Sequence, residues 1–117
     1  MKNPTEAEIV KSIRVLLNFL GIWHWKVFTG PHNVPGVSDI LGIYQGKFLA
    51  IEVKRPGLEP TELQKSFLNQ VRESGGIGIV ATCCDDVITA LGLWDKFKRG
   101  NPNVKPEIHK ETETTKD

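Results

Sequence analysis

Apolar residues recur at helical spacing near the start of the chain. They are Ile9, Ile13, Leu16, Leu17 and Leu20. Thr5 and Glu8 have the spacing of a capping box, and Gly21 is typical of a helix end. The pattern therefore predicts an amphipathic helix over residues 5–20.

Three stretches with strand character follow this helix. Residues 23–28 alternate aromatic and polar side chains, and residues 38–44 and 47–54 are rich in β-branched and other apolar residues. The last two stretches are separated only by Gln45-Gly46, which can form a two-residue hairpin turn. We therefore expect three strands, with the second and third paired as an antiparallel hairpin.

The remaining elements alternate between helix and strand. The pattern of residues 61–74 predicts a second amphipathic helix, and that of residues 77–81 predicts a buried strand. Asp85 or Asp86 can begin a last helix. The element order is α-β-β-β-α-β-α, an α/β arrangement with a small mixed sheet covered by helices. The apolar side of the second helix carries Leu63, Phe67, Leu68 and Val71, and the last helix carries Val87, Ile88, Leu91 and Leu93.

The predicted hairpin brings two carboxylates together. A two-residue turn places Tyr44 opposite Lys47, and counting back along both strands places Asp39 opposite Glu52. Directly opposed residues point to the same face of a sheet, with Cβ atoms about 4.5–5.5 Å apart. Lys54 lies two residues beyond Glu52 and so shares that face. Two carboxylates and an amine should therefore meet at one end of the hairpin.

This pairing has two interpretations. Opposed like charges destabilise a sheet, so the register could slip, or both carboxylates could stay in water with Lys54 neutralising one of them. Alternatively, a divalent cation lies between the carboxylates. Mg²⁺ favours one or two carboxylates together with water and substrate phosphate.

Two further polar residues belong to the helices. Glu6 lies on the apolar side of the first helix, whereas Glu8 lies on the opposite side. Glu6 therefore points towards the core side, although a first-turn glutamate that stays in water is the alternative. Gln64 lies within the apolar stripe of the second helix, and it can equally form a capping box with Thr61.

Other side chains carry less functional information. His24 and His32 have no second ligand at metal-binding spacing, which argues against a zinc site. Trp23 and Trp25 are expected to pack in the core or at an interface, with base stacking as a minor alternative.

Composition and charge limit the class of protein. Apolar residues make up 39% and charged residues 25% of the 117 residues, a globular balance. Fifteen basic and 14 acidic residues give a net charge of +1, which excludes a strongly basic coat but not a local basic patch. No apolar run could span a membrane, and the N-terminus lacks an apolar signal region. We expect a domain over residues 1–94, a flexible charged tail over residues 95–117, and a cytoplasmic protein.

Two stretches closely resemble a known family. Residues 35–42 (PGVSDILG) and 48–57 (FLAIEVKRPG) resemble the VRR-NUC nucleases, which belong to the PD-(D/E)XK superfamily. Glu6 with Ile9 in the first helix and a downstream Gln64 add to the resemblance, which covers residues 5–93. It implies a restriction-endonuclease-like mixed sheet flanked by helices.

The resemblance also implies roles for the residues of the hairpin. Asp39, Glu52 and the backbone carbonyl of Val53 would bind Mg²⁺, for which Mn²⁺ could substitute, and no organic cofactor is implied. Lys54 would activate the attacking water or stabilise the phosphate in its transition state. Glu6 would assist the metal site, and Gln64 would position the second helix or contact the substrate. The reaction would be phosphodiester hydrolysis.

The implied substrate is DNA. Stand-alone VRR-NUC proteins of this kind resemble phage or prophage enzymes, which implies a bacterial host cell. They are also similar to archaeal Holliday junction resolvases, which implies a homodimer and cleavage of branched DNA. The alternatives are a flap, nicking or non-specific DNase with the same site, or a catalytically idle module that binds DNA or protein. Candidate DNA contacts are Lys26, Thr29, His32, Asn33, Ser38 and Arg55.

Overall fold

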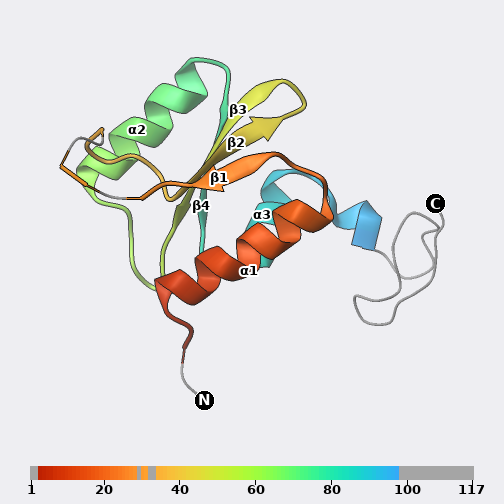
Figure 1. Ribbon diagram of the computed structural model, residues 1–117. Coiled ribbons are helices and arrows are strands. Elements are labelled where there is room, and N and C mark those ends of the chain that lie inside the picture. The colour runs from red at the N-terminus through yellow and green to blue at the C-terminus, as the bar shows by residue number, and fades with distance from the viewer. Residues whose placement is uncertain (1–2, 29, 32–33, 98–117) are drawn as a thin grey trace. The chain divides into compact units, whose positions relative to one another are not determined.

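The computed structural model describes residues 3–28, 30–31 and 34–97. The chain divides into a unit of residues 1–87, which holds the sheet and the first two helices, and a unit of residues 88–117. The order α-β-β-β-α-β-α is confirmed (Figure 1). The elements are α1 (Glu6–Phe19), β1 (His24–Lys26), β2 (Ile40–Tyr44), β3 (Lys47–Val53), α2 (Glu62–Glu73), β4 (Ile77–Ala81), α3 (Cys84–Ala90) and a 3₁₀ turn, η1 (Trp94–Phe97).

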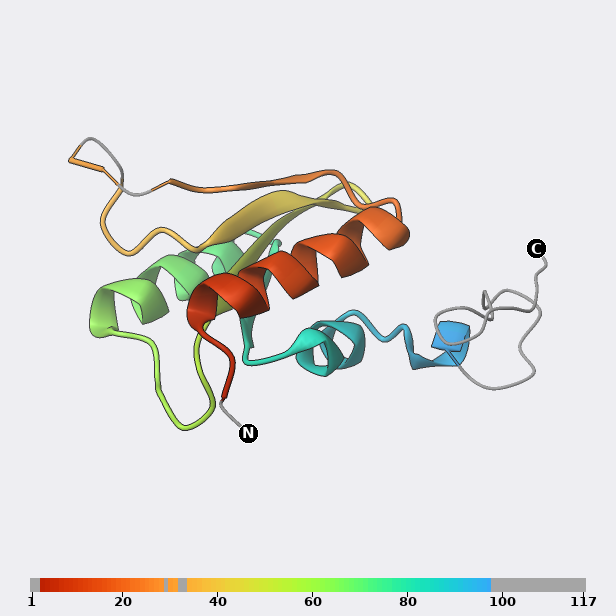
Figure 2. The same cartoon turned by 60° about the horizontal axis from the view of Figure 1, so that its bottom comes forward.

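The four strands form one mixed sheet in the order β1-β2-β3-β4. The first two pairings are antiparallel, and β3 pairs with β4 in parallel. A parallel pair requires a crossover connection, and α2 provides it. The two views place α1 and α2 on opposite sides of the sheet (Figures 1 and 2). The predicted small mixed sheet covered by helices is therefore confirmed.

Both predicted capping boxes are present. The backbone N–H of Thr5 donates to Oε1 of Glu8 at 2.8 Å, and the N–H of Glu8 donates to Oγ1 of Thr5 at 3.1 Å. Thr61 and Gln64 make the same pair of bonds at the start of α2, at 2.8 and 3.2 Å. These bonds satisfy backbone donors that have no partner within the helix, which fixes where α1 and α2 begin.

Alternate residues of β3 face opposite sides of the sheet. On one side Ala50 is fully buried and packs with Leu68 and Val71 of α2. The other face is more deeply buried and forms the larger core with the apolar stripe of α1. Its most buried side chains are Ile9, Ile13, Leu17, Ile40, Leu49, Ile51 and Val53.

The structure narrows one expectation about packing and corrects another. Trp23 and Trp25 are 67% and 40% exposed, so of their two expected locations the core is excluded and an interface remains. The reason is the position of α2, which packs mainly over β3 and β4 and reaches β2 at Leu41. Leu63 is also exposed, because the buried stripe of α2 begins one turn later, at Phe67.

Three elements differ clearly from their predicted bounds. The strand β1 is shorter than the predicted 23–28, although the carbonyl of Trp23 still accepts a hydrogen bond from the N–H of Ile43. The strand β2 begins at Ile40 and not at residue 38. The last helix begins at Cys84 and ends at Ala90, so it excludes both Leu91 and Leu93, and the N–H of Leu93 donates to the Ile88 carbonyl.

Most of the predicted tail, from residue 98 onward, lies outside the described residues. None of the described helices is long and apolar enough to cross a membrane.

Candidate active site

The hairpin of β2 and β3 has the predicted register. Tyr44 pairs with Lys47, and the ladder runs back to Ile40 opposite Ile51. The turn is possible because Gln45 and Gly46 both adopt positive φ, at 52° and 79°, which a type I′ turn requires. One step beyond the ladder, Asp39 lies across from Glu52.

Asp39 is held at a point where three strands meet. Its Oδ2 accepts a hydrogen bond from the backbone N–H of Val53 at 2.7 Å. Its backbone carbonyl accepts one from the N–H of Val27, just after β1, at 2.8 Å. The Asp39 carboxylate is therefore fixed against β3 by its side chain and against β1 by its backbone.

The chain before Asp39 packs closely on the start of α2. A Cβ atom added at Gly36 would lie 2.3 Å from the backbone oxygen of Leu63, and Gly36 has a φ of +77°. Only glycine fits both conditions. The glycine of the PGVSD stretch therefore lets this loop lie against α2 and lead directly into Asp39.

Glu52 is a buried carboxylate with few partners. The residue is 2% exposed, and its Oε1 has no hydrogen-bond partner among the described residues. Its Oε2 lies 3.8 Å from Nζ of Lys54, whose side chain is 13% exposed. A buried charge normally requires close pairing, and a contact of this length to a single cation leaves half of the carboxylate unsatisfied.

The surroundings of Glu52 favour its neutral form. Burial raises the pKa of Glu52 to about 8, and the negative charge of Asp39 is the next largest cause. The positive charge of Lys54 lowers this pKa but does not cancel the rise, and the negative charge of Glu6 raises it further. The site therefore lacks positive charge for its carboxylates.

The two glutamates of the first turn of α1 have different surroundings, as predicted. Glu6 is half-buried, and its charge acts on the pKa of Glu52. Glu8 is exposed, and its carboxylate caps the helix.

Gln64 is half-buried, and its Oε1 accepts a hydrogen bond from the backbone N–H of Thr61. Its described contact is thus a capping bond, and a role at the active site stays a prediction.

These residues fit a hard divalent cation. The donors are carboxylate oxygens, one of them buried and unpartnered, in a site short of positive charge. The described residues contain no group of three or more His, Cys, Asp or Glu side chains that could hold a metal ion. The fit is therefore to a cation that takes two carboxylates and completes its shell with water or substrate oxygens, and not to a zinc-type cage.

The predicted DNA contacts have different surroundings. Arg55 is exposed and Lys26 half-buried. Ser38 is fully buried and its Oγ has no hydrogen-bond partner among the described residues, so its side chain offers DNA no contact in this structure. The other three predicted contacts, Thr29, His32 and Asn33, lie outside the described residues.

Two cations of α1, Lys11 and Arg14, were not predicted from the sequence as candidate DNA contacts. Lys11 and Arg14, on the polar side of this helix, line a hollow together with Lys26. The spacing of three between Lys11 and Arg14, which places both on one helical face, was the available signal.

Comparison with known proteins supports the fold. No family model and no curated protein matches the chain. Ten chains of solved structures match it. One, described as "VRR_NUC domain protein", is 21% identical, has a TM-score of 0.65, and is matched over 83% of this chain and 93% of its own. Another, described as "VRR_NUC domain", is also 21% identical, with a TM-score of 0.62 over 74% of this chain and 94% of its own.

Proposed function

We propose that this protein is a divalent-metal-dependent DNA endonuclease, which hydrolyses phosphodiester bonds at the Asp39–Glu52 pair. The chain has the fold of VRR_NUC domains. The observation that carries the proposal is the buried Glu52 carboxylate. One of its oxygens has no hydrogen-bond partner among the described residues, and of these residues only Lys54 pairs with it, beside Asp39. Such an arrangement raises the free energy of the folded protein unless the carboxyl group is protonated or a cation completes the site.

Asp39 and Glu52 would hold Mg²⁺ or Mn²⁺, with the Val53 carbonyl as a further proposed ligand. The bond from the Val53 N–H to Oδ2, which fixes the Asp39 carboxylate, supports this role. When bound, the cation would supply Lewis acidity and make a coordinated water more acidic. Hydrolysis would form a bond between a water oxygen and phosphorus and break the phosphorus–oxygen bond to the leaving nucleotide. The proton lost by the water would pass to solvent, and the leaving oxygen would take one up.

Lys54 would act on the phosphate. Its ammonium group is a compact charge on a largely buried stem, 3.8 Å from Oε2 of Glu52. Once a cation balances Glu52, the Lys54 charge can stabilise the additional negative charge that develops on the phosphate oxygens. Glu6 would be a positioning residue, because its carboxylate influences Glu52 from the first turn of α1.

For the substrate, we propose branched DNA of the Holliday junction type, cut by a homodimer. A symmetric junction presents two equivalent phosphodiesters, which two active sites related by a two-fold axis can reach together. A flap, nicking or non-specific DNase with the same site is the second candidate, and the catalytically idle module is the third. A bacterial host, a phage origin and a cytoplasmic location stay predictions from the sequence resemblance.

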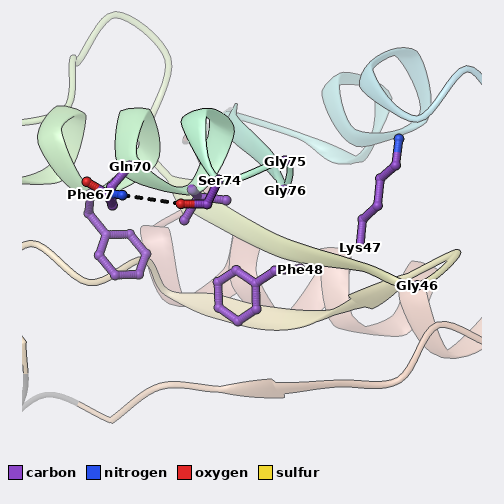
Figure 3. Close-up of a pocket in the computed structure, with 9 residues that line it drawn as sticks. Gly46, Lys47, Phe48, Phe67, Gln70, Ser74, Gly75 and Gly76 are labelled. Atoms are coloured by element: carbon purple, nitrogen blue, oxygen red, sulfur yellow. Dashed lines mark hydrogen bonds between the residues drawn. The ribbon is translucent and has the colours of Figure 1, made fainter.

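An exposed aromatic face supports the homodimer. Trp23 and Trp25 lie 5.0 Å apart between ring centroids and share a sheet face with Ile43 and Phe48, which are cross-strand partners. All four are at least 39% exposed. Phe48 and Phe67 line a hollow between the hairpin and α2 (Figure 3). The volume of this hollow is about 390 Å³. We call the surface of Trp23, Trp25, Ile43 and Phe48 the aromatic face.

A second copy of the chain suits the aromatic face better than DNA does. The face exposes about 400 Å², if a full side chain contributes roughly 150–250 Å². That is about half of the roughly 800 Å² per partner in a standard interface. Its four side chains carry no charge, so an identical face can meet it without repulsion. DNA binding, in contrast, depends on cations placed against phosphates.

Cleavage of a panel of DNA structures tests the proposal. Labelled four-way junction, flap and linear duplex would be incubated with the protein in Mg²⁺, Mn²⁺ or EDTA. Metal-dependent paired cuts at the junction alone support the leading proposal, and equal cutting of all three substrates supports the non-specific DNase. Binding without cutting supports the idle module.

A further inference from the structure

The polar side of α1 and the edge strand β1 enclose a groove with a marked charge. Three of its lining residues, Lys11, Arg14 and Lys26, are cations, and none of the residues that line it is acidic. Its volume is about 360 Å³. Basic and acidic residues are nearly equal in number over the whole chain. A lining with three cations and no acid is therefore a local concentration of charge, which we call the basic groove.

Two of the three cations of the basic groove are positioned by their neighbours. Nε of Arg14 donates to Nε2 of His24 at 3.3 Å, while Nδ1 of the same ring lies 2.9 Å from the Ile22 carbonyl, to which it donates. Nζ of Lys26 lies 4.6 Å from the centre of the Phe28 ring. Lys11 is exposed. No described salt bridge involves any of the three groove cations, so no acid among the described residues neutralises their charges.

The basic groove lies next to the proposed active site. Lys26 pairs with Ile40 in the sheet, and the following residue, Val27, donates its N–H to the carbonyl of Asp39. On the helix side, the groove starts at Ala7, directly after Glu6, and extends to Asn18. At 1.5 Å per residue this stretch of α1 is about 16 Å long. Lys26 shares the α1 side of the sheet with Ile40 and Ile51, whereas Glu52 shares the α2 side with Ala50. The groove therefore lies beside the Asp39 backbone on the α1 side, and it extends along α1 over a distance of several nucleotides.

Its dimensions suit a nucleic-acid backbone. Successive phosphates of one DNA strand are about 3.4 Å apart along the duplex axis, so 16 Å covers four or five of them. We propose that the basic groove binds the phosphate backbone of a duplex arm of the DNA substrate, with Lys11, Arg14 and Lys26 contacting phosphates. This inference rests on the proposed nuclease function and adds to it a second contact surface for the DNA, on the α1 side of the sheet.

A salt series on the full chain tests the groove without requiring cleavage. Binding of a fluorescent duplex would be followed by anisotropy in EDTA, at several salt concentrations, for the wild type, Lys11→Gln and Arg14→Gln. The matched control is Lys65→Gln, because Lys65 is a half-buried lysine of α2 that already pairs with Glu59 and Glu62, each at 3.6 Å. Circular dichroism would check that all variants fold.

We expect each groove variant to bind several-fold more weakly at low salt. Each should also reduce the slope of log K against log salt by about one, as the loss of one phosphate contact does. Lys65→Gln should match the wild type. Lys11 is exposed and makes no described side-chain hydrogen bond, so Lys11→Gln tests the groove even if Arg14→Gln perturbs the contact with His24.

Groove variants that keep the wild-type affinity and slope would overturn the inference, and cleavage by the wild type would still support the nuclease. A full chain that binds an acidic protein but no DNA would also overturn it. A third outcome separates the two proposals. If the groove variants lose DNA binding and the wild type cuts no DNA with any metal, the DNA-binding role of the basic groove is supported and the nuclease proposal is rejected.

Discussion

The carboxylate of Asp39 and the backbone of Val53 are joined by a hydrogen bond of 2.7 Å across the β2–β3 hairpin. This bond fixes the orientation of one carboxylate, and it comes from the residue between Glu52 and Lys54. The three groups proposed to act on the cation and the phosphate are therefore held by a single local pairing. That pairing depends on the two-residue turn at Gln45 and Gly46.

The first prediction concerns how pH affects the metal-free protein. The pKa of Glu52 is about 8 in the folded state, against 4.5 as its ordinary value. Between these values the folded state binds more protons than the unfolded state, so the contribution of Glu52 to stability is full below pH 4.5 and is lost as pH rises through 8. We expect the melting temperature in EDTA to fall over this range more steeply for the wild type than for Glu52→Gln.

Adding a divalent cation should reverse this loss. At pH 8 the deprotonated pair can bind Mg²⁺ or Mn²⁺, which raises stability by RT ln(1 + [metal]/Kd). A hundredfold excess over Kd corresponds to about 2.7 kcal/mol. Thermal unfolding with and without metal measures the shift. Equal shifts in the wild type and in Glu52→Gln would show that the cation binds elsewhere.

Glu6 and Glu8 provide a matched pair of substitutions. Glu6→Ala should reduce turnover with little change in melting temperature, because Glu6 acts on Glu52 through its charge. Glu8→Ala should do the opposite, because it removes the side-chain oxygen that accepts the capping bond from the Thr5 N–H. Loss of a cap costs about 1 kcal/mol, or roughly 4–8 °C in a domain of this size.

Turnover and thermal unfolding of both variants check this prediction. If Glu8→Ala harms turnover more than Glu6→Ala does, the assignment of Glu6 to the site is wrong.

The aromatic face predicts a change in oligomeric state. Trp23→Glu should weaken self-association on the order of 30-fold, since a central aromatic residue of an interface contributes about 2 kcal/mol or more. Leu58→Glu is the matched control, because Leu58 is 55% exposed in the loop after β3 and lies outside the aromatic face. Sedimentation velocity over a range of concentrations compares the two variants. A wild type that is monomeric at all concentrations contradicts the dimer.

Local rules predicted the hairpin and the helix starts because each depends on residues close in sequence. A two-residue turn fixes the register of β2 and β3, so the approach of Asp39 and Glu52 follows from counting. The capping boxes at Thr5 and Thr61 are likewise local. The side of α1 that carries Glu6 could be predicted because Ile9 and Ile13 define its buried face.

Tertiary packing decided the features that were not predicted. Alternation assigns Trp23 and Trp25 to one face of β1, but it does not show that α2 packs mainly over β3 and β4. The burial of Ser38 depends on the surrounding fold, and not on its neighbours in sequence. The basic groove needs α1 and β1 to lie side by side, which no spacing within either element reveals.

Cleavage by the wild type and by Glu52→Gln tests the central claim most directly. Both proteins would be incubated with labelled four-way junction and matched duplex, in Mg²⁺, Mn²⁺ and EDTA. We predict metal-dependent cleavage by the wild type and a loss of at least about 100-fold in Glu52→Gln, since the electrostatic effect of a bound cation is worth several kcal/mol. Full activity in Glu52→Gln, or equal activity of the wild type in EDTA, would contradict the assignment of the Asp39–Glu52 pair as the active site.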